Sequence, residues 1–327
     1  MDGINNLKNV KNRMPITFSP GDLKCAARLY AVADLLRKRF YKAGRMWRDI
    51  PYASVSSSQK LDLYLPPKGD GPFPVVLWIH GGGWFSGDKV DFQLIHQLRV
   101  LKRGYALVSV NHRLSDEAIF PAQIYDVKAA VRWIRANSKS YSLNPSKIAA
   151  WGASSGGHLA ALLGTSGGVE ELEDLSLGNP GESSRVQAVI DWYGPMDLLN
   201  MDKHLVQCGL YPWHNSPDTP ETALIGGLAT QYPDQVKKIN PMTYISPESP
   251  PFLIEHGVKD KIVPMHQSVL LYERLTSTIG PEKVILRLFL KAGHGDLPIS
   301  PGILIYGPYS RRRNINIVLG FLDKYLK

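Results

Sequence analysis

The chain is poor in cysteine, and its start lacks an unbroken apolar stretch. Its 327 residues include two cysteines, Cys25 and Cys208, which lie far apart and outside any CxxC pair. This excludes a dense disulfide framework and gives no sign of a cysteine-bound zinc or of a dithiol redox centre. Residues 1–20 mix asparagine, lysine and aspartate with scattered apolar residues, unlike a signal peptide or a membrane span. We therefore expect a cytoplasmic protein.

The motifs of nucleic-acid-binding proteins are also missing. The net charge of +9 could suit an acidic partner. The basic residues are nevertheless spread along the chain, and the short arginine run at 311–313 is typical of a solvated loop. We expect no nucleic-acid partner.

Hydrophobic residues make up 44% of the chain, enough for a large core without disulfides or metal clips. From residue 47 onward, short apolar runs alternate with helical patterns. The expected strands are 47–54, 60–65, 74–80, 105–111, 147–152, 186–193, 252–257 and 284–290, the first two forming an antiparallel pair. The expected helices are 91–102, 122–137, 155–163, 265–276 and 315–325. The alternation predicts an α/β fold, with a mostly parallel eight-stranded sheet covered by helices on both faces.

One serine stands in a pattern that suits nucleophilic chemistry. Gly152, Ser154 and Gly156 form GxSxG, directly after the expected strand 147–152 and directly before a small-residue helix. A sharp strand-to-helix turn exposes the serine hydroxyl, and the glycines are needed because a Cβ would strike neighbouring backbone. We predict that Ser154 is a nucleophile.

A glycine run after the expected strand 74–80 supplies the second part of the pattern. His80 is followed by three glycines, 81–83, and by Trp84. Successive glycines let backbone amides turn toward a substrate oxygen. We expect an oxyanion hole formed by the amides of Gly82, Gly83 and Ser155, the last at the positive end of a helix dipole.

A serine nucleophile needs a base, and the base needs an acid to orient it. His294 is flanked by glycines just beyond the last expected strand, and Asp260 follows the strand 252–257. The order nucleophile, acid, histidine is that of the α/β-hydrolases. Asp197, which follows the strand 186–193, is the competing acid. The histidines at 80, 158 and 256 and the aspartates at 126 and 191 are interpreted as structural.

These residues resemble the hormone-sensitive-lipase-like branch of the α/β-hydrolases, in particular bacterial esterases related to feruloyl and acetyl-xylan esterases. The resemblance runs from residue 74 to 295 and also rests on the segments 111–115, 120–122, 126–133, 191–195 and 251–254. It implies a serine carboxylesterase that needs no metal or organic cofactor and acts on a small-molecule ester. The chain departs from the family at Val258, where members commonly carry a second aspartate. The segment 298–313 looks long, and residues up to 42 have no counterpart.

Two segments stand outside the alternation. Residues 25–42 have the apolar stripe of an amphipathic helix, so we expect residues 1–45 to form a helical cap on a catalytic domain at 46–327, with membrane contact disfavoured. Residues 200–240 are rich in proline, glycine and aromatics and are predicted to form an irregular lid. The substrate pocket is expected to be bounded by Trp84, Tyr211, Trp213 and His214.

Two other functions stay open at this point. Kynurenine formamidases share a similar glycine loop and triad, so an N-formyl amide is an alternative substrate. Plant gibberellin receptors use the fold for binding alone, but they lack the catalytic histidine that His294 supplies here. A homodimer is compatible with the sequence.

Overall fold

An eight-stranded sheet forms the centre of the computed structural model, which describes residues 45–91, 93–295 and 308–327. The strand order is β1-β2-β4-β3-β5-β6-β7-β8. The strands are β1 (Met46–Pro51), β2 (Lys60–Tyr64), β3 (Phe73–Ile79), β4 (Ala106–Val110), β5 (Leu143–Ala153), β6 (Ala188–Trp192), β7 (Phe252–Gly257) and β8 (Val284–Phe289). All eight expected strands are present, and their ends shift by a few residues.

The pairing of the strands brings the loops of interest to one edge of the sheet. β1 and β2 are antiparallel to their neighbours, and every pair from β4 through β8 is parallel. In register, Ile79 of β3 lies beside Gly152 of β5, which lies beside Asp191 of β6. Because the carboxyl ends of parallel strands meet at the same edge, the loops after β3, β5, β7 and β8 open there together.

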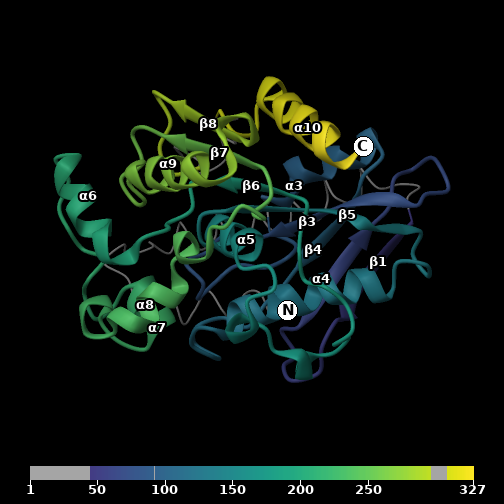
Figure 1. The fold of residues 1–327 in the computed structure, drawn as a ribbon, viewed down its shortest axis with the longest axis horizontal. Helices are drawn as coiled ribbons and strands as arrows, with labels where there is room; N and C mark the ends of the chain where they lie inside the picture. The colour runs from purple at the N-terminus through teal and green to yellow at the C-terminus, as the bar shows by residue number, and fades with distance from the viewer. Residues whose placement is uncertain (1–44, 92, 296–307) are drawn as a thin grey trace, which may run out of the picture.

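Helices cover both faces of the sheet (Figure 1). Along β3, Val75, Leu77 and Ile79 belong to one core cluster, while Val76 and Trp78 belong to the other. The first face is covered by α4 (Ala122–Ala136), α5 (Ser155–Thr165) and α9 (His266–Ile279), and the second by α3 (Leu94–Gln97), η2 (Leu98–Arg103) and α10 (Arg312–Leu326). Burial on both faces explains why these strands are almost continuously apolar.

The expected helix at 91–102 is confirmed only in part. The structure instead has the single turn of α3 followed by the 3₁₀ segment η2. The Asp91 carboxylate accepts the Gln93 amide at 2.9 Å and keeps this stretch in a turn, so helix formation starts later. Gly104, with φ of +84°, ends the segment in a left-handed conformation.

The insertion at 200–240 is built from short helices, whereas the sequence predicted an irregular segment. They are α6 (Met201–Gln207), α7 (Pro220–Ile225), η6 (Ala229–Gln231) and α8 (Pro233–Ile239). Pro220 and Pro233 stand in the first turns of α7 and α8, where a missing N–H costs nothing, so these prolines mark helix starts. Figure 1 shows α6, α7 and α8 grouped at one end of the sheet.

Other short elements are η3 (Glu170–Leu172), η4 (Leu175–Leu177), η5 (Leu198–Asn200), η7 (Pro241–Tyr244) and η8 (Pro281–Lys283). The predicted helix at 25–42, the cap at 1–45 and most of the segment 298–313 lie outside the described residues. A membrane span would need a longer and more apolar helix than any among the described residues.

Candidate active site

Ser154 stands at the turn between β5 and α5 in a strained backbone conformation. Its φ and ψ are 54° and −125°, and its amide donates to the carbonyl of Trp192 at 2.8 Å. A Cβ on Gly152 would lie 2.0 Å from the Gly156 oxygen, and one on Gly156 would lie 2.2 Å from the Ile79 oxygen. Both glycines are therefore required for the turn that presents the serine.

The imidazole of His294 lies between Ser154 and Asp260. Its Nδ1 is 2.7 Å from Asp260 Oδ2, and its Nε2 is 2.9 Å from Ser154 Oγ. A carboxylate only accepts hydrogen bonds, so Nδ1 carries the proton and the Nε2 lone pair faces the serine hydroxyl. The arrangement suits His294 to take the serine proton.

Asp260 is held as an ionised acceptor. Its Oδ1 accepts the amides of Ile262 and Val263 at 2.8 and 2.9 Å, and its Oδ2 is also 3.3 Å from His256 Nε2. Burial by itself would raise the pKa of Asp260, but the charge of His294 and the hydrogen bonds from both histidines outweigh it. The pKa therefore lies well below the usual range, and the carboxylate stays charged at neutral pH.

The competing acid, Asp197, has a different role. Its carboxylate accepts the amide of Asn200 at 3.3 Å and the side-chain N–H of the same residue at 2.7 Å. It thereby caps η5. Asp191 is buried and accepts the Gly194 amide at 3.0 Å, and burial raises its pKa to about 7. Within the described residues, neither carboxylate is bonded to His294.

The glycine run after β3 lies beside the serine. A Cβ on Gly81 would lie 3.3 Å from Ser154 Cβ. Gly82 and Gly83 have φ of +124° and +62°, and the carbonyl of Gly82 accepts both the amide and the hydroxyl of Ser86. Within the described parts of the chain, neither the Gly82 nor the Gly83 amide donates to a protein acceptor. Two amides are thus available to a substrate oxygen.

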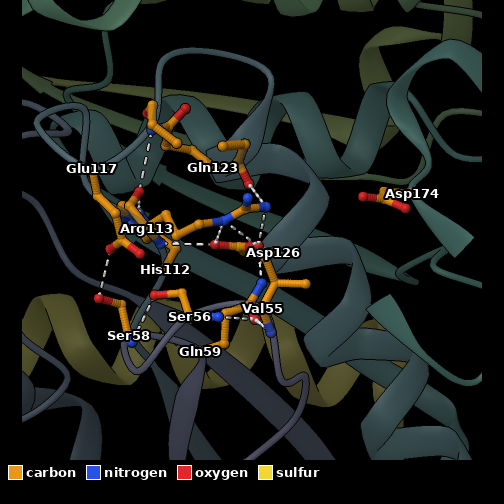
Figure 2. Close-up of polar contacts among 12 residues, drawn as sticks. Val55, Ser56, Ser58, Gln59, His112, Arg113, Glu117, Gln123, Asp126 and Asp174 are labelled. Carbon is orange, nitrogen blue, oxygen red and sulfur yellow. Dashed lines mark hydrogen bonds and ion pairs between the residues drawn. The ribbon is translucent and has the colours of Figure 1, made fainter. Parts of the chain in front are cut away.

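A buried ion pair holds the neighbouring loop, and apart from the family resemblance no sequence pattern indicates it. Figure 2 shows Arg113, from the loop after β4, against Asp126 of α4, with Gln59 reaching the same carboxylate. Arg113 Nη2 and Gln59 Nε2 are each 2.7 Å from Asp126 Oδ1. The adjacent His112 stacks on His80, with ring centroids 4.8 Å apart. The network therefore supports the start of the glycine loop.

The histidines interpreted as structural are buried. Burial lowers the pKa of both His80 and His158 to about 4, so both rings are neutral. His158 Nε2 donates to the carbonyl of Ile239 at 2.9 Å, and its Nδ1 accepts from Trp84. His256 Nε2 lies 2.8 Å from the Val263 carbonyl as well as near Asp260.

The four residues expected around the pocket differ in exposure. Trp84 is 1% exposed and His214 is 2% exposed, and both bond to protein groups, so burial argues against direct substrate contact by either. Tyr211 is 84% exposed and forms no wall by itself. Trp213 is partly exposed and stacks on His214, with centroids 3.8 Å apart. Trp213 and Tyr211 stay predictions as substrate contacts.

Tyr193 is a site neighbour that the sequence reasoning missed. It follows β6 with φ of 44°, and its ring meets the His294 ring edge-on at 4.8 Å. A Cβ on Gly295 would lie 2.8 Å from the Tyr193 hydroxyl, so that glycine leaves room for the tyrosine beside the imidazole.

Among the described residues, no group of three His, Cys, Asp or Glu side chains is placed to hold a metal ion.

The strand order and the serine turn define an α/β-hydrolase fold. A family model described as BD-FAE matches residues 61–275, which is more than half of the chain. The chain belongs to this family.

Relatives with names and structures agree with that assignment. Esterase LipQ of Mycobacterium tuberculosis is 31% identical over 222 residues, which cover 67% of this chain and 50% of that protein. A truncated carbohydrate esterase from gut microbiota is 35% identical, with a TM-score of 0.72, over 86% of this chain and 96% of the other. A bifunctional GH43-CE protein of Bacteroides eggerthii is also 35% identical, with a TM-score of 0.75, over 86% and 38%. This chain spans about half the length of the first curated relatives that it matches.

Proposed function

We propose that this chain hydrolyses small carboxylic esters through an acyl-enzyme formed on Ser154. The observation that carries the proposal is the unbroken hydrogen-bonded series from Ser154 through His294 to Asp260, with joining distances of 2.9 and 2.7 Å. A module that only binds its ligand has no use for a base and an acid aligned on a nucleophile. The names of the relatives also support hydrolysis of an ester.

The mechanism follows from the protonation states. Ser154 attacks the ester carbonyl carbon while His294 Nε2 takes its proton, and Asp260 stabilises the imidazolium that forms. The amides of Gly82, Gly83 and Ser155 stabilise the oxyanion, and the loss of one donor of this kind typically costs about 100- to 1,000-fold in rate. His294 then gives the proton to the leaving alcohol. Water repeats the cycle on the acyl-enzyme and releases the acid.

The proposed substrates are carbohydrate esters of either a short acyl group such as acetyl or an aromatic acyl group such as feruloyl. The carbohydrate esterase that matches almost end to end at 35% identity supports this class. The exposed ring of Tyr211 and the partly exposed ring of Trp213 suit an aromatic acyl group or the face of a sugar. The cytoplasmic location and the homodimer stay predictions.

Replacing the nucleophile tests the proposal. Ser154→Ala should abolish turnover of p-nitrophenyl acetate, because no hydroxyl remains to attack, while thermal unfolding stays that of the wild type. Ser277→Ala, which removes a hydroxyl from an exposed part of α9, is the matched control and should keep full activity. Turnover retained by Ser154→Ala would rule out this nucleophile.

A substrate panel tests the class. We expect acetylated xylan or methyl ferulate to be cleaved with a higher kcat/KM than p-nitrophenyl esters of longer acyl chains. Faster turnover of N-formylkynurenine than of phenyl acetate would overturn the ester assignment in favour of the amide.

A further inference from the structure

His214, in the insertion between α6 and α7, has two hydrogen bonds that fix its charge. The ring is buried, its Nδ1 lies 2.9 Å from Glu221 Oε1, and its Nε2 lies 2.8 Å from the carbonyl oxygen of Ile262. A carboxylate and a carbonyl both accept, so both ring nitrogens have to donate. A neutral imidazole has a single N–H. With Glu221 as an ionised carboxylate, the two bonds require the imidazolium form.

The two hydrogen-bond partners of His214 connect it to two different loops of the site. The carbonyl of Ile262 accepts from His214, and the amide of the same residue donates to Asp260 Oδ1 at 2.8 Å. Glu221 follows Pro220, whose Cβ would lie 3.0 Å from a Cβ built on Gly83. His214 thus contacts the acid loop, which is the loop after β7 that carries Asp260 and Ile262. Its partner Glu221 lies next to Pro220, which packs on the oxyanion loop, the glycine run 81–83 after β3.

Other residues of the insertion also fix the position of His214. The Asp202 carboxylate on α6 accepts the amides of Trp213, His214 and Asn215 at 2.8, 2.8 and 3.0 Å. The Trp213 ring stacks on the imidazole. The position of His214 is therefore set by the insertion, and the imidazole transmits that position to Ile262.

We propose that His214, in its protonated form, is a positioning residue that locks the insertion at 200–240 onto the acid loop and the oxyanion loop. The proposal rests on the function proposed above, because the groups it aligns are Asp260 and the oxyanion amides. His214 acts in this way by fixing the positions of other residues, and it does not contact the substrate itself. A neutral ring keeps a single N–H, so either the bond to Glu221 or the bond to Ile262 would be lost on deprotonation.

The charges around the ring favour its protonation. Glu221 on α7 and Asp202 on α6 both face it, whereas Asp260 on the acid loop is turned to His294 and His256. Burial opposes the charge, but Glu221 and the bond to Ile262 outweigh it and raise the pKa of His214 above its usual value. Lys259 and Lys261 on the acid loop are exposed.

Because folding raises the pKa of His214, the two hydrogen bonds of its ring depend on pH in one direction. A group whose pKa is raised by folding stabilises the folded state below its unfolded pKa, and this stabilisation is lost as the pH rises through the folded pKa. Both hydrogen bonds of the ring are therefore present below a pH of about 6.5, the usual pKa of histidine, and one of them is lost as the pH rises through the raised pKa of His214.

The charge of the ring is read directly by NMR. In protein labelled with ¹⁵N-histidine, the ring signals that disappear in His214→Gln belong to His214. At about pH 6, below the usual pKa of histidine, both of its nitrogens should be protonated. Glu221→Gln should lower its titration midpoint by about 1 to 3 pH units, the usual effect of removing an adjacent opposite charge. A His214 ring that is neutral at about pH 6 in the wild type would overturn the proposal. This readout does not depend on esterase activity.

Kinetics on p-nitrophenyl acetate test the positioning role. The alkaline fall of wild-type kcat should move to lower pH in Glu221→Gln by the same amount as the NMR midpoint. In His214→Gln, kcat at pH 7 should drop about 10- to 100-fold with KM little changed, as expected for displaced catalytic groups. Glu171→Gln is the matched control, because it removes an exposed ion pair between Glu171 of η3 and Lys238 of α8. This variant should keep the wild-type dependence of kcat on pH.

The outcomes separate this proposal from the proposed function. An alkaline limb that stays in place in Glu221→Gln, while the NMR midpoint shifts, would show that His214 only packs the insertion. Should His214→Gln fail to fold, Glu221→Gln and the wild-type NMR titration still decide. Absence of ester turnover in the wild type would contradict the hydrolase assignment. The NMR titration would still report whether the His214 ring is charged.

Discussion

Asp260→Asn should disable the site by reversing the hydrogen bond between Asp260 and His294. Asp260 Oδ1 accepts two backbone amides, from Ile262 and Val263. An asparagine will keep its carbonyl oxygen toward those donors, because its NH₂ group cannot accept from them. The NH₂ group then takes the place of Oδ2, 2.7 Å from His294 Nδ1. There it can only donate.

The consequence for the histidine is a change of tautomer. His294 Nδ1 has to accept from the introduced NH₂ group, so its proton moves to Nε2, the nitrogen that faces Ser154. The imidazole can no longer take the serine proton. We expect kcat to fall by about 10⁴, the typical cost of this tautomer change in serine hydrolases, with KM little altered. That factor corresponds to about 5.5 kcal/mol of lost transition-state stabilisation.

The assay is steady-state hydrolysis of p-nitrophenyl acetate, with kcat and KM determined separately and folding checked by thermal unfolding. Asp197→Asn is the matched control, since it makes the same change at the competing carboxylate, and it should keep activity within a few-fold of the wild type. A reversal, with Asp197→Asn inactive and Asp260→Asn active within about 10-fold of the wild type, would refute the assignment of the acid.

Two further predictions concern packing. Gly156→Ala should destabilise the fold by about 3 kcal/mol, because the added Cβ would lie 2.2 Å from the Ile79 oxygen. Gly293→Ala is the control and should be tolerated, because its Cβ would have no neighbour closer than 3.7 Å. Equal denaturation midpoints for the two variants would contradict this prediction. Arg113→Ala should cost about 3–5 kcal/mol in chemical denaturation, since it leaves buried Asp126 without its charge partner, and a loss under about 1 kcal/mol would show that the pair is unimportant.

Much of the sheet and the serine turn was predictable because the signals are local. A strand buried on both faces is an apolar run, and the turn at Ser154 needs glycines at fixed positions on either side. Asp260 and His294 could be chosen because each follows a parallel strand, and the carboxyl ends of such strands meet. The choice between Asp260 and Asp197 needed the structure, since both follow strands.

The features that the sequence did not predict depend on contacts between distant segments. His214 and Ile262 are 48 residues apart, and Arg113 meets Asp126 across a helix start. No periodicity reports such pairs. The helices α6, α7 and α8 have seven, six and seven residues, about two turns each, so an apolar stripe is too short to distinguish them from irregular chain.

The most direct test of the central claim is to trap the acyl-enzyme. p-Nitrophenyl acetate mixed with the protein and quenched in acid within milliseconds should leave one acetyl group per chain, located by peptide mass spectrometry on Ser154. The burst of p-nitrophenol should match that stoichiometry. An acetyl group found on another residue, or steady turnover with an unmodified Ser154 and no burst, would contradict the account.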